Sequence, residues 1–303
     1  MTQGRKDYLH LHFIVLIWGF TAILGLVIDM PPVEMVFYRT LIATLGLYII
    51  IKSTRKSFRI NTSRDYWIIL GTGGLIAIHW ITFFLSARVS NVSVCLAGLA
   101  TGSLWTAFIE PLSVGRKIKG YEVLLSIVAF MGIGVIFNVE FDYLAGLLLS
   151  LLSAFMAASF SVINSKLTQK YDPYVITFYE MIGACVSIVL FFPIYGTFYV
   201  DGLQLGGTSM DFLYLIILAV FCTVYAHSIS VELMKRMSVF SINLTINLEP
   251  VYGIILALLI FGESEEMSSG FYLGTGLILA SVLLYPMLNK RFKQKALSTD
   301  LMR

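Results

Sequence analysis

The chain has 303 residues, of which 58% are hydrophobic and 13% are charged, and its formal net charge is +3. An ordinary soluble domain carries roughly 25% charged residues, so this composition indicates an integral membrane protein. A membrane-spanning helix uses about 20 mostly apolar residues, and the apolar runs of this chain leave only short connections. The 303 residues therefore leave no room for a soluble ATPase domain, and the sequence contains no GxxxxGKS/T nucleotide-binding loop.

Ten apolar runs follow one another along the chain, and each is long enough to form a membrane helix. In chain order they are approximately Leu9–Ile28, Pro32–Ile51, Tyr66–Ala87, Ser90–Val114, Tyr121–Asn138, Tyr143–Asn164, Pro173–Pro193, Asp211–Leu233, Val239–Phe261 and Ser268–Leu288. We interpret the first run as a membrane helix rather than a cleavable signal, because Asp29, Met30 and two prolines follow it in place of a small-residue cleavage pattern. The sequence therefore predicts an all-α integral membrane protein with ten transmembrane helices.

The basic residues are unevenly distributed between the connections. If the N-terminus is cytoplasmic, nearly all of the 21 Lys and Arg residues fall on the cytoplasmic side, whereas Arg88 falls on the far side and Arg39 lies within a helix. Cytoplasmic connections of membrane proteins are enriched in Lys and Arg. We therefore predict that both termini are cytoplasmic and that residues 289–303 form a basic cytoplasmic tail. The expected location is a bacterial plasma (inner) membrane.

Short motifs of the first half of the chain recur in the second half in similar register. Phe37-Tyr38-Arg39 lies early in the second run, and Phe178-Tyr179-Glu180 lies early in the seventh. His79 and His227 are each followed, at the same distance, by an arginine. Two units with an odd number of helices each must have opposite orientations, and such inverted repeats are the usual framework of secondary transporters. The two predicted five-helix inverted repeats are residues 9–138 and 143–288.

The ninth run contains a more specific motif, in which Leu248-Glu249-Pro250 leads into Leu258-Leu259-Ile260-Phe261-Gly262-Glu263. Together with Phe37-Tyr38-Arg39 and the two five-helix units, this motif resembles the EamA family of the drug/metabolite transporter superfamily over nearly the whole chain. The first repeat departs from the pattern, since Ala100-Thr101-Gly102 stands in place of Leu-Glu-Pro and Gly115 is followed by arginine. The resemblance implies a ten-helix carrier that works by alternating access and often exports amino acids or related metabolites.

Three charged residues lie deep within the predicted helices. A charged side chain near the bilayer centre costs at least ~2.5–3.5 kcal/mol on insertion scales, so Arg39, Glu180 and Glu249 must face protein or water. We expect Arg39 to pair with Glu180 or Glu249, which would neutralise both costs. The alternatives are a substrate carboxylate bound by Arg39 and purely structural contacts. Glu249 precedes Pro250, whose missing amide hydrogen frees a carbonyl one turn back, so we expect a kinked or broken helix there.

Other polar and aromatic residues of the predicted helices suggest a central cavity. A tryptophan or amide within the membrane needs a hydrogen-bond partner, which a hydrated cavity provides and lipid does not. The candidate substrate-binding residues are Trp18, Arg39, His79, Trp80, Trp105, Asn164, Glu180, His227, Asn243, Asn247 and Glu249. The alternative is that they only pack or bond between helices, and His79 is either a neutral structural histidine or one that titrates during transport.

These observations predict a secondary transporter that exports small metabolites such as amino acids by alternating access. The alternatives are an intramembrane enzyme using Glu or His and a non-transporting receptor or scaffold. Against an enzyme, the sequence has no HExxH motif and no nucleophile with a matched base, and its three cysteines form no metal or disulfide pattern. We predict no cofactor, metal or catalytic residue.

The expected partners are a small-molecule substrate and the lipid bilayer, with no nucleic acid. A homodimer would use the fifth and tenth helices, where glycines permit close helix contacts within or between chains. These glycines are Gly132, Gly134, Gly270, Gly274 and Gly276.

Overall fold

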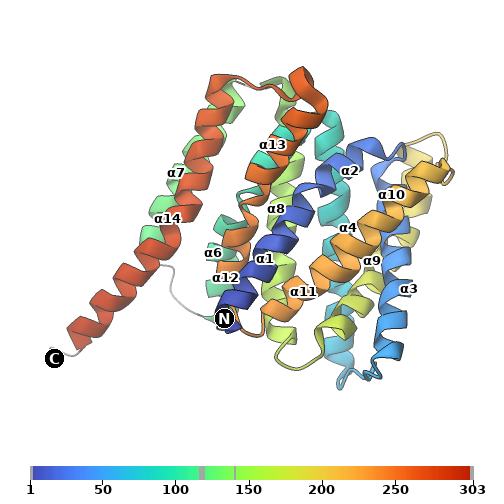
Figure 1. Ribbon diagram of the computed structural model, residues 1–303, viewed down its shortest axis with the longest axis horizontal. Coiled ribbons are helices and arrows are strands. Elements are labelled where there is room, and N and C mark those ends of the chain that lie inside the picture. The colour runs from blue at the N-terminus through green and yellow to red at the C-terminus, as the bar shows by residue number, and fades with distance from the viewer. Residues whose placement is uncertain (1–2, 116–119, 140, 301–303) are drawn as a thin grey trace.

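The computed structural model describes residues 3–115, 120–139 and 141–300, and every regular element among them is a helix (Figure 1). In chain order the elements are α1 (Gln3–Gly19), α2 (Thr21–Val27), α3 (Pro32–Ser53), α4 (Ser63–Val89), α5 (Val92–Leu99), α6 (Gly102–Val114), α7 (Gly120–Val139), η1 (Phe141–Tyr143), α8 (Leu144–Leu167), α9 (Pro173–Phe198), α10 (Ser209–Ala219), η2 (Val220–Tyr225), α11 (Ala226–Leu233), α12 (Val239–Ile246), α13 (Glu249–Phe261), η3 (Gly262–Glu265) and α14 (Ser269–Asp300). Of the short elements, η1 and η3 are 3-10 helices and η2 is a π-helix.

Seven helical segments of the described residues are long and apolar enough to cross a membrane. They are Gln3–Val27, Pro32–Ser53, Ser63–Val89, Val92–Ser113, Leu144–Leu167, Pro173–Phe198 and Ser209–Leu233. Three shorter apolar segments, Val123–Ile136, Glu249–Phe261 and Ser269–Ser281, fall within the fifth, ninth and tenth predicted runs. The all-helical membrane fold is thus confirmed, whereas the count of ten crossings and the inverted orientation of two repeats stay predictions.

Several of the predicted membrane helices are interrupted. The first run is divided at Phe20, the fourth at Ala100 and Thr101, and the ninth at Asn247 and Leu248, while the eighth contains the π-helix η2. The break expected in the ninth run is present, and its proline falls in the first turn of α13, where a missing amide hydrogen leaves no bond unmade. The fourth run breaks at the matching place in the first half of the chain, although it contains no proline there.

The α4 and α9 helices cross with their backbones in contact. A Cβ atom on Gly73 would collide with the backbone of Glu180, and one on Gly183 would collide with the backbone of Leu70. Inside a membrane, small residues at a crossing allow helices to approach closely and to pack by dispersion. This crossing therefore fixes the depth of Glu180 relative to α4.

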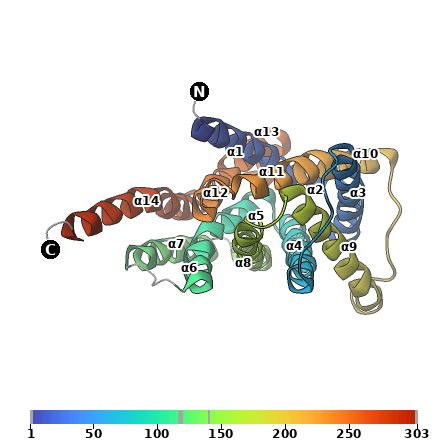
Figure 2. The ribbon, with the colours of Figure 1, turned by 90° about the horizontal axis from the view of Figure 1, so that it is seen from below.

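The α7 and α14 helices stand together at one edge of the bundle (Figures 1 and 2). A Cβ atom on Gly132 would lie 2.6 Å from the carbonyl oxygen of Gly274, and the reverse contact is equally close. Nothing lies within 4 Å of the corresponding positions on Gly134 and Gly276. The Gly132–Gly274 crossing is made within one chain, so this pair is used in folding, and the homodimer stays a prediction.

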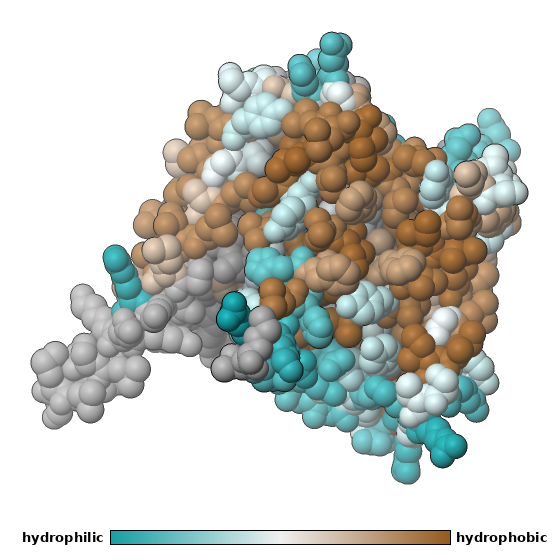
Figure 3. Space-filling model, in the orientation of Figure 1, coloured by the Kyte–Doolittle hydropathy of each residue, from teal (hydrophilic) through white to brown (hydrophobic). Residues whose placement is uncertain are grey.

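Much of the face seen in Figure 3 is apolar between its two ends. Large side chains such as Ile49, Leu190 and Leu259 are 65%, 71% and 77% exposed, as residues that face lipid would be. Hydrophilic residues gather at the two ends of the bundle in the same view. We call the end with the N-terminus and the α3–α4 connection the N-terminal end, and the end with the α9–α10 connection the opposite end (Figure 1).

Candidate functional site

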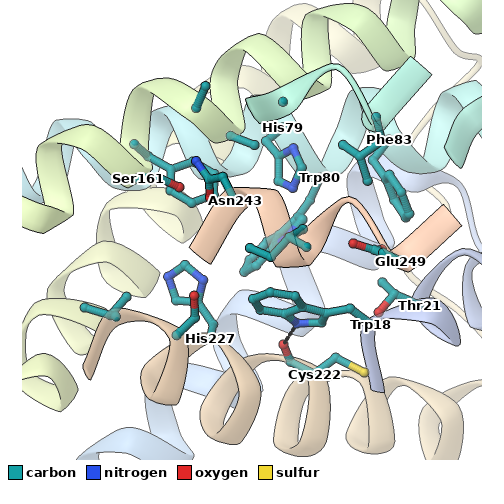
Figure 4. Close-up of a pocket in the computed structure, with 18 of the residues that line it drawn as sticks. Trp18, Thr21, His79, Trp80, Phe83, Ser161, Cys222, His227, Asn243 and Glu249 are labelled. Carbon is teal, nitrogen blue, oxygen red and sulfur yellow. Dashed lines mark hydrogen bonds between the residues drawn. The ribbon is translucent and has the colours of Figure 1, made fainter. Parts of the chain in front are cut away.

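A cavity lies where the broken helices α1–α2, α5–α6 and α12–α13 meet α3, α4, α8 and the η2–α11 segment. Its volume, counted where the centre of a water molecule fits, is about 90 Å³. At about 10–15 Å³ per water, this space corresponds to roughly six to nine waters or one small metabolite. Eight of the eleven predicted residues line it, and they are Trp18, Arg39, His79, Trp80, His227, Asn243, Asn247 and Glu249. Figure 4 labels all of them except Arg39 and Asn247. Their role in binding a substrate stays a prediction.

The π-helix η2 holds two of these residues in place. A π-helix bonds from residue i to i+5 instead of i+4, which leaves backbone groups available to side chains. The indole Nε1 of Trp18 donates a hydrogen bond to the carbonyl oxygen of Cys222, 204 positions away, over 3.0 Å (Figure 4). Nε of Arg39 donates to Oγ1 of Thr223 over 2.7 Å. The Arg39 guanidinium also lies 3.7 Å from the centre of the Trp80 ring, a favourable cation–π contact.

The predicted ion pair of Arg39 with Glu180 or Glu249 is wrong. Within the described parts of the chain, no carboxylate lies in ion-pairing distance of Arg39, and its Nη1 atom is buried without a hydrogen-bond partner. The guanidinium is held instead by Thr223 and Trp80. Glu180 faces His227, and Glu249 lies on the cavity wall in the first turn of α13, where no described side chain hydrogen-bonds to it. The cavity therefore contains a cation and a carboxylate that do not pair with each other.

His79 joins α4 to α8. Its Nδ1 atom lies 2.9 Å from the carbonyl oxygen of Ser153 and 2.7 Å from the Ser153 hydroxyl, which itself donates to the His79 carbonyl oxygen over 2.9 Å. Because a carbonyl oxygen can only accept, we assign the proton to Nδ1, which leaves Nε2 as an acceptor. His79 is thus bonded as a structural histidine and still lines the cavity.

Two of the broken helices, α5–α6 and α12–α13, are joined by polar side chains at and near their breaks. Nδ2 of Asn243 donates to Oγ1 of Thr106 over 2.7 Å. The amide of Asn247 lies 2.6 Å from Oγ of Ser103, and with its oxygen on that side its nitrogen donates to the carbonyls of Ala100 and Asn243. The Ala100 carbonyl, at the break between α5 and α6, is thus satisfied by a side-chain amide, whereas the Asn243 carbonyl also accepts from the backbone N–H of Asn247. The asparagines of α12 therefore position both broken helices around the cavity.

This geometry can be compared with known proteins. The EamA-like transporter family matches the chain over residues 8–138 and again over residues 144–286. The chain belongs to the EamA-like transporter family. This family is part of the drug/metabolite transporter superfamily. The match supports a membrane transporter and confirms the family that the sequence motifs indicate.

Relatives of this EamA-like transporter are similar over most of its length. An uncharacterized transporter of Archaeoglobus fulgidus is 24% identical over 292 residues, which cover 92% of this chain and 98% of the relative. An uncharacterized transporter of Clostridium kluyveri is 22% identical over 205 residues, which cover 64% and 65% of the two chains. One crystal structure shares the fold with a TM-score of 0.65 at 14% identity, covering 93% of this chain and 97% of the other. The relatives support a transporter and name no substrate.

Three of the predicted residues of this EamA-like transporter do not line the cavity. Trp105 donates from Nε1 to Oγ1 of Thr101 over 3.2 Å and packs edge-on against Phe155. Asn164 is fully buried, and neither its amide oxygen nor its nitrogen has a hydrogen-bond partner among the described residues. Glu180 is fully buried behind His227. Helix periodicity alone cannot tell a residue that faces the cavity from one that faces a neighbouring helix.

Sequence reasoning also missed part of the cavity wall of this EamA-like transporter. The missed polar residues include Thr21, Ser161 and Ser230, and the missed aromatic residues are Phe83 and Phe160. Small hydroxyl residues and phenylalanines occur throughout these apolar helices, so they carry no distinctive signal. Their places on cavity-facing turns next to Trp18 and His227 become evident only when the helices are assembled.

Proposed function

We propose that this EamA-like transporter is a secondary transporter that exports small metabolites such as amino acids by alternating access around the central cavity. The proposed arrangement has ten membrane helices in two inverted five-helix repeats, with both termini in the cytoplasm and the chain in the plasma membrane. The direction of transport, the substrate and the mechanism are parts of this proposal. Family membership supports its transporter component.

The observation that carries the proposal is the composition of the cavity. Trp18, Trp80 and Phe160 offer apolar faces, while Arg39 offers a cationic group and Glu249 an acidic group, and the two form no ion pair. A small solute with both a polar, charged part and an apolar part would find partners for each. Such groups are costly against lipid, whereas a hydrated cavity that binds and releases a solute accommodates all of them.

Contacts at both ends of the bundle would suit alternating access. At the opposite end, the Tyr38 hydroxyl donates to the carbonyl of Leu205 over 2.8 Å, and the backbone N–H of Gln204 donates to Oε1 of Glu34 over 3.0 Å. These bonds tie the α9–α10 connection to α3. A carrier must break the contacts at one end while those at the other hold, so this connection is a candidate gate.

At the N-terminal end, Arg236 donates from Nε and from Nη2 to the two oxygens of Asp7, each over 3.1 Å. The hydrogen bonds from Arg236 to Asp7 raise the pKa of the Arg236 guanidinium above its usual value. The pair joins α1 to the link between α11 and α12. All three of these helices contribute residues to the cavity wall. The pair is therefore the candidate gate at this end.

The proposal is tested by counterflow in proteoliposomes that contain the purified chain. A panel of amino acids and related metabolites is presented, and the solutes that move identify the cargo. Trp18→Ala removes a cavity indole and should slow counterflow by roughly tenfold or more, because loss of a buried aromatic anchor costs at least about 1.4 kcal/mol of binding. Trp67→Ala is the matched control, since Trp67 is 69% exposed, and it should behave like the parent.

Direction is measured with the cargo so identified, by comparing uptake into inverted and right-side-out membrane vesicles under the same gradient. An exporter accumulates its solute in the inverted vesicles. Absence of movement for every solute in the panel, or equal activity of the Trp18→Ala and parent proteins, would contradict a transport site in this cavity.

A further inference from the structure

The carboxylate of Glu180 is the most isolated acidic group of the cavity region. Glu180 lies on α9, has no exposed surface, and does not line the cavity. Its Oε1 atom has no hydrogen-bond partner in the described residues, and its Oε2 atom lies 3.3 Å from Nε2 of His227. Glu249 differs, because its side chain reaches the cavity, where water can solvate it. Glu180 therefore depends on His227 for any compensation of its charge.

The α9 backbone at Glu180 packs directly against α4, and the Glu180 side chain has no exposed surface. At this level the two backbones are in contact, since a Cβ atom on Gly73 would already collide with the carbonyl oxygen of Glu180. A water molecule cannot enter such a contact. His227, in contrast, lines the cavity (Figure 4), and its ring makes T-shaped contacts with Trp80 and Phe160. The path for a proton between Glu180 and water therefore runs through His227.

We propose that Glu180 and His227 form a proton-binding site that exchanges its proton with the cavity and couples proton movement to transport. The coupling part of this inference rests on the proposed function. With one shared proton, the pair is neutral overall, either as a carboxylic acid beside a neutral imidazole or as a carboxylate beside an imidazolium. Loss of that proton to cavity water leaves one negative charge in a site that water does not reach, which is costly. The pair thus keeps its proton while the cavity is closed and releases it when the cavity is hydrated.

The other ionisable groups around His227 modulate this exchange. Arg39 from α3 favours loss of the proton, and Glu249 from α13, when charged, opposes it. His79 from α4 is held by Ser153 through Nδ1. The cavity surfaces of α1 and α8, which pack against α11, contribute no ionisable group among the described residues; the remaining titratable group is Cys222 in η2. A charged cargo bound between Arg39 and Glu249 would alter this balance, and by linkage the proton would alter the binding of the cargo.

The site is tested first without any cargo. The full chain is labelled with ¹⁵N-histidine, of which it has four, and the imidazole signals are recorded from pH 5 to 8 in detergent micelles. His227→Gln assigns the signals of interest by removing them. In the parent, the His227 signals should change with pH across this window. In Glu180→Gln, the change should be lost, because a buried imidazole without its anionic partner stays neutral.

The matched control for this measurement is His10→Gln, a variant of an exposed histidine of α1 outside the cavity, which should leave the response of His227 in place. A His227 signal that does not change with pH in the parent would overturn the proposal, as would an unaltered response in Glu180→Gln. Glutamine keeps the size of Glu180, and size-exclusion chromatography checks that the variant is folded. If Glu180→Gln does not fold, Glu180→Asp takes its place and must change the pH range of the His227 response.

The coupling is tested in proteoliposomes with the cargo that the solute panel identifies. An imposed pH gradient should accelerate flux by the parent and by Glu263→Gln, a variant of an exposed glutamate in η3. Glu180→Gln should keep counterflow and lose the acceleration, and a retained acceleration would overturn the proposal. If the parent moves no solute at all, the proposed function fails, while the histidine titration still decides whether the proton site exists.

Discussion

Thr223 offers a direct test of how η2 holds the cavity arginine. In Thr223→Val the side-chain shape is kept and Oγ1 is lost, so Nε of Arg39 becomes a second buried nitrogen without a partner beside Nη1. A hydrogen bond to a charged group contributes roughly 1.5–3 kcal/mol, and an orphaned charged donor costs at least as much. We expect Thr223→Val to lower the free energy of unfolding by about 2–3 kcal/mol.

The measurement is unfolding by sodium dodecyl sulfate in mixed micelles, followed by tryptophan fluorescence. Thr223→Ser keeps the hydroxyl and loses one methyl group, so its cost should be about 1 kcal/mol or less. Thr177→Val is the matched control, because Thr177 is fully buried and its hydroxyl has no hydrogen-bond partner among the described residues; it should cost nothing. If Thr223→Val costs no more than Thr177→Val, then Thr223 does not hold Arg39 and the reasoning fails.

Gly183→Ala should destabilise the protein by about 1–3 kcal/mol, because the new methyl group must displace the α4 backbone; Gly71→Ala, with nothing within 4 Å, should leave the unfolding curve unchanged. Arg236→Gln should cost about 1 kcal/mol, since Arg236 is 38% exposed, and adding Asp7→Asn should recover most of it; a larger loss in the double variant would refute the pairing. A cysteine placed at Asp201 should react with an impermeant reagent only from outside the cell; labelling from the cytoplasm would reverse the proposed topology.

Much of the fold could be predicted because membrane helices are determined locally. About 20 consecutive apolar residues must satisfy their own backbone hydrogen bonds in lipid, and a helix does so without help from neighbours. The runs Pro32–Ile51 and Tyr66–Ala87 accordingly fall inside α3 and α4. The interruptions were harder to foresee. The break next to Pro250 has a local cause. At the break at Ala100, by contrast, the free carbonyl of Ala100 accepts a hydrogen bond from the side-chain amide of Asn247, which belongs to another broken helix.

The site was partly foreseen for a similar reason. Polar and aromatic residues within a membrane must meet protein or water, so residues such as Trp18, His79 and Asn243 could be named from the sequence as cavity candidates. Their partners could not be named. Arg39 was expected to meet a carboxylate on grounds of charge. It instead bonds to Thr223 and stacks on Trp80, because η2, the helix that packs against it, places a hydroxyl group rather than a carboxylate beside Nε.

The amino-acid sequence by itself determined that the chain is a helical membrane protein of the EamA-like family, since apolar runs, basic connections and the Leu-Glu-Pro motif are properties of short segments. Tertiary structure decided which charges meet. The contact of Gly73 with the α9 backbone sets the depth of Glu180, and the π-helix η2 sets the direction of Thr223 and His227. A shift of one residue at either place would turn Glu180 away from His227, or Thr223 away from Arg39, because neighbouring positions on a helix point about 100° apart.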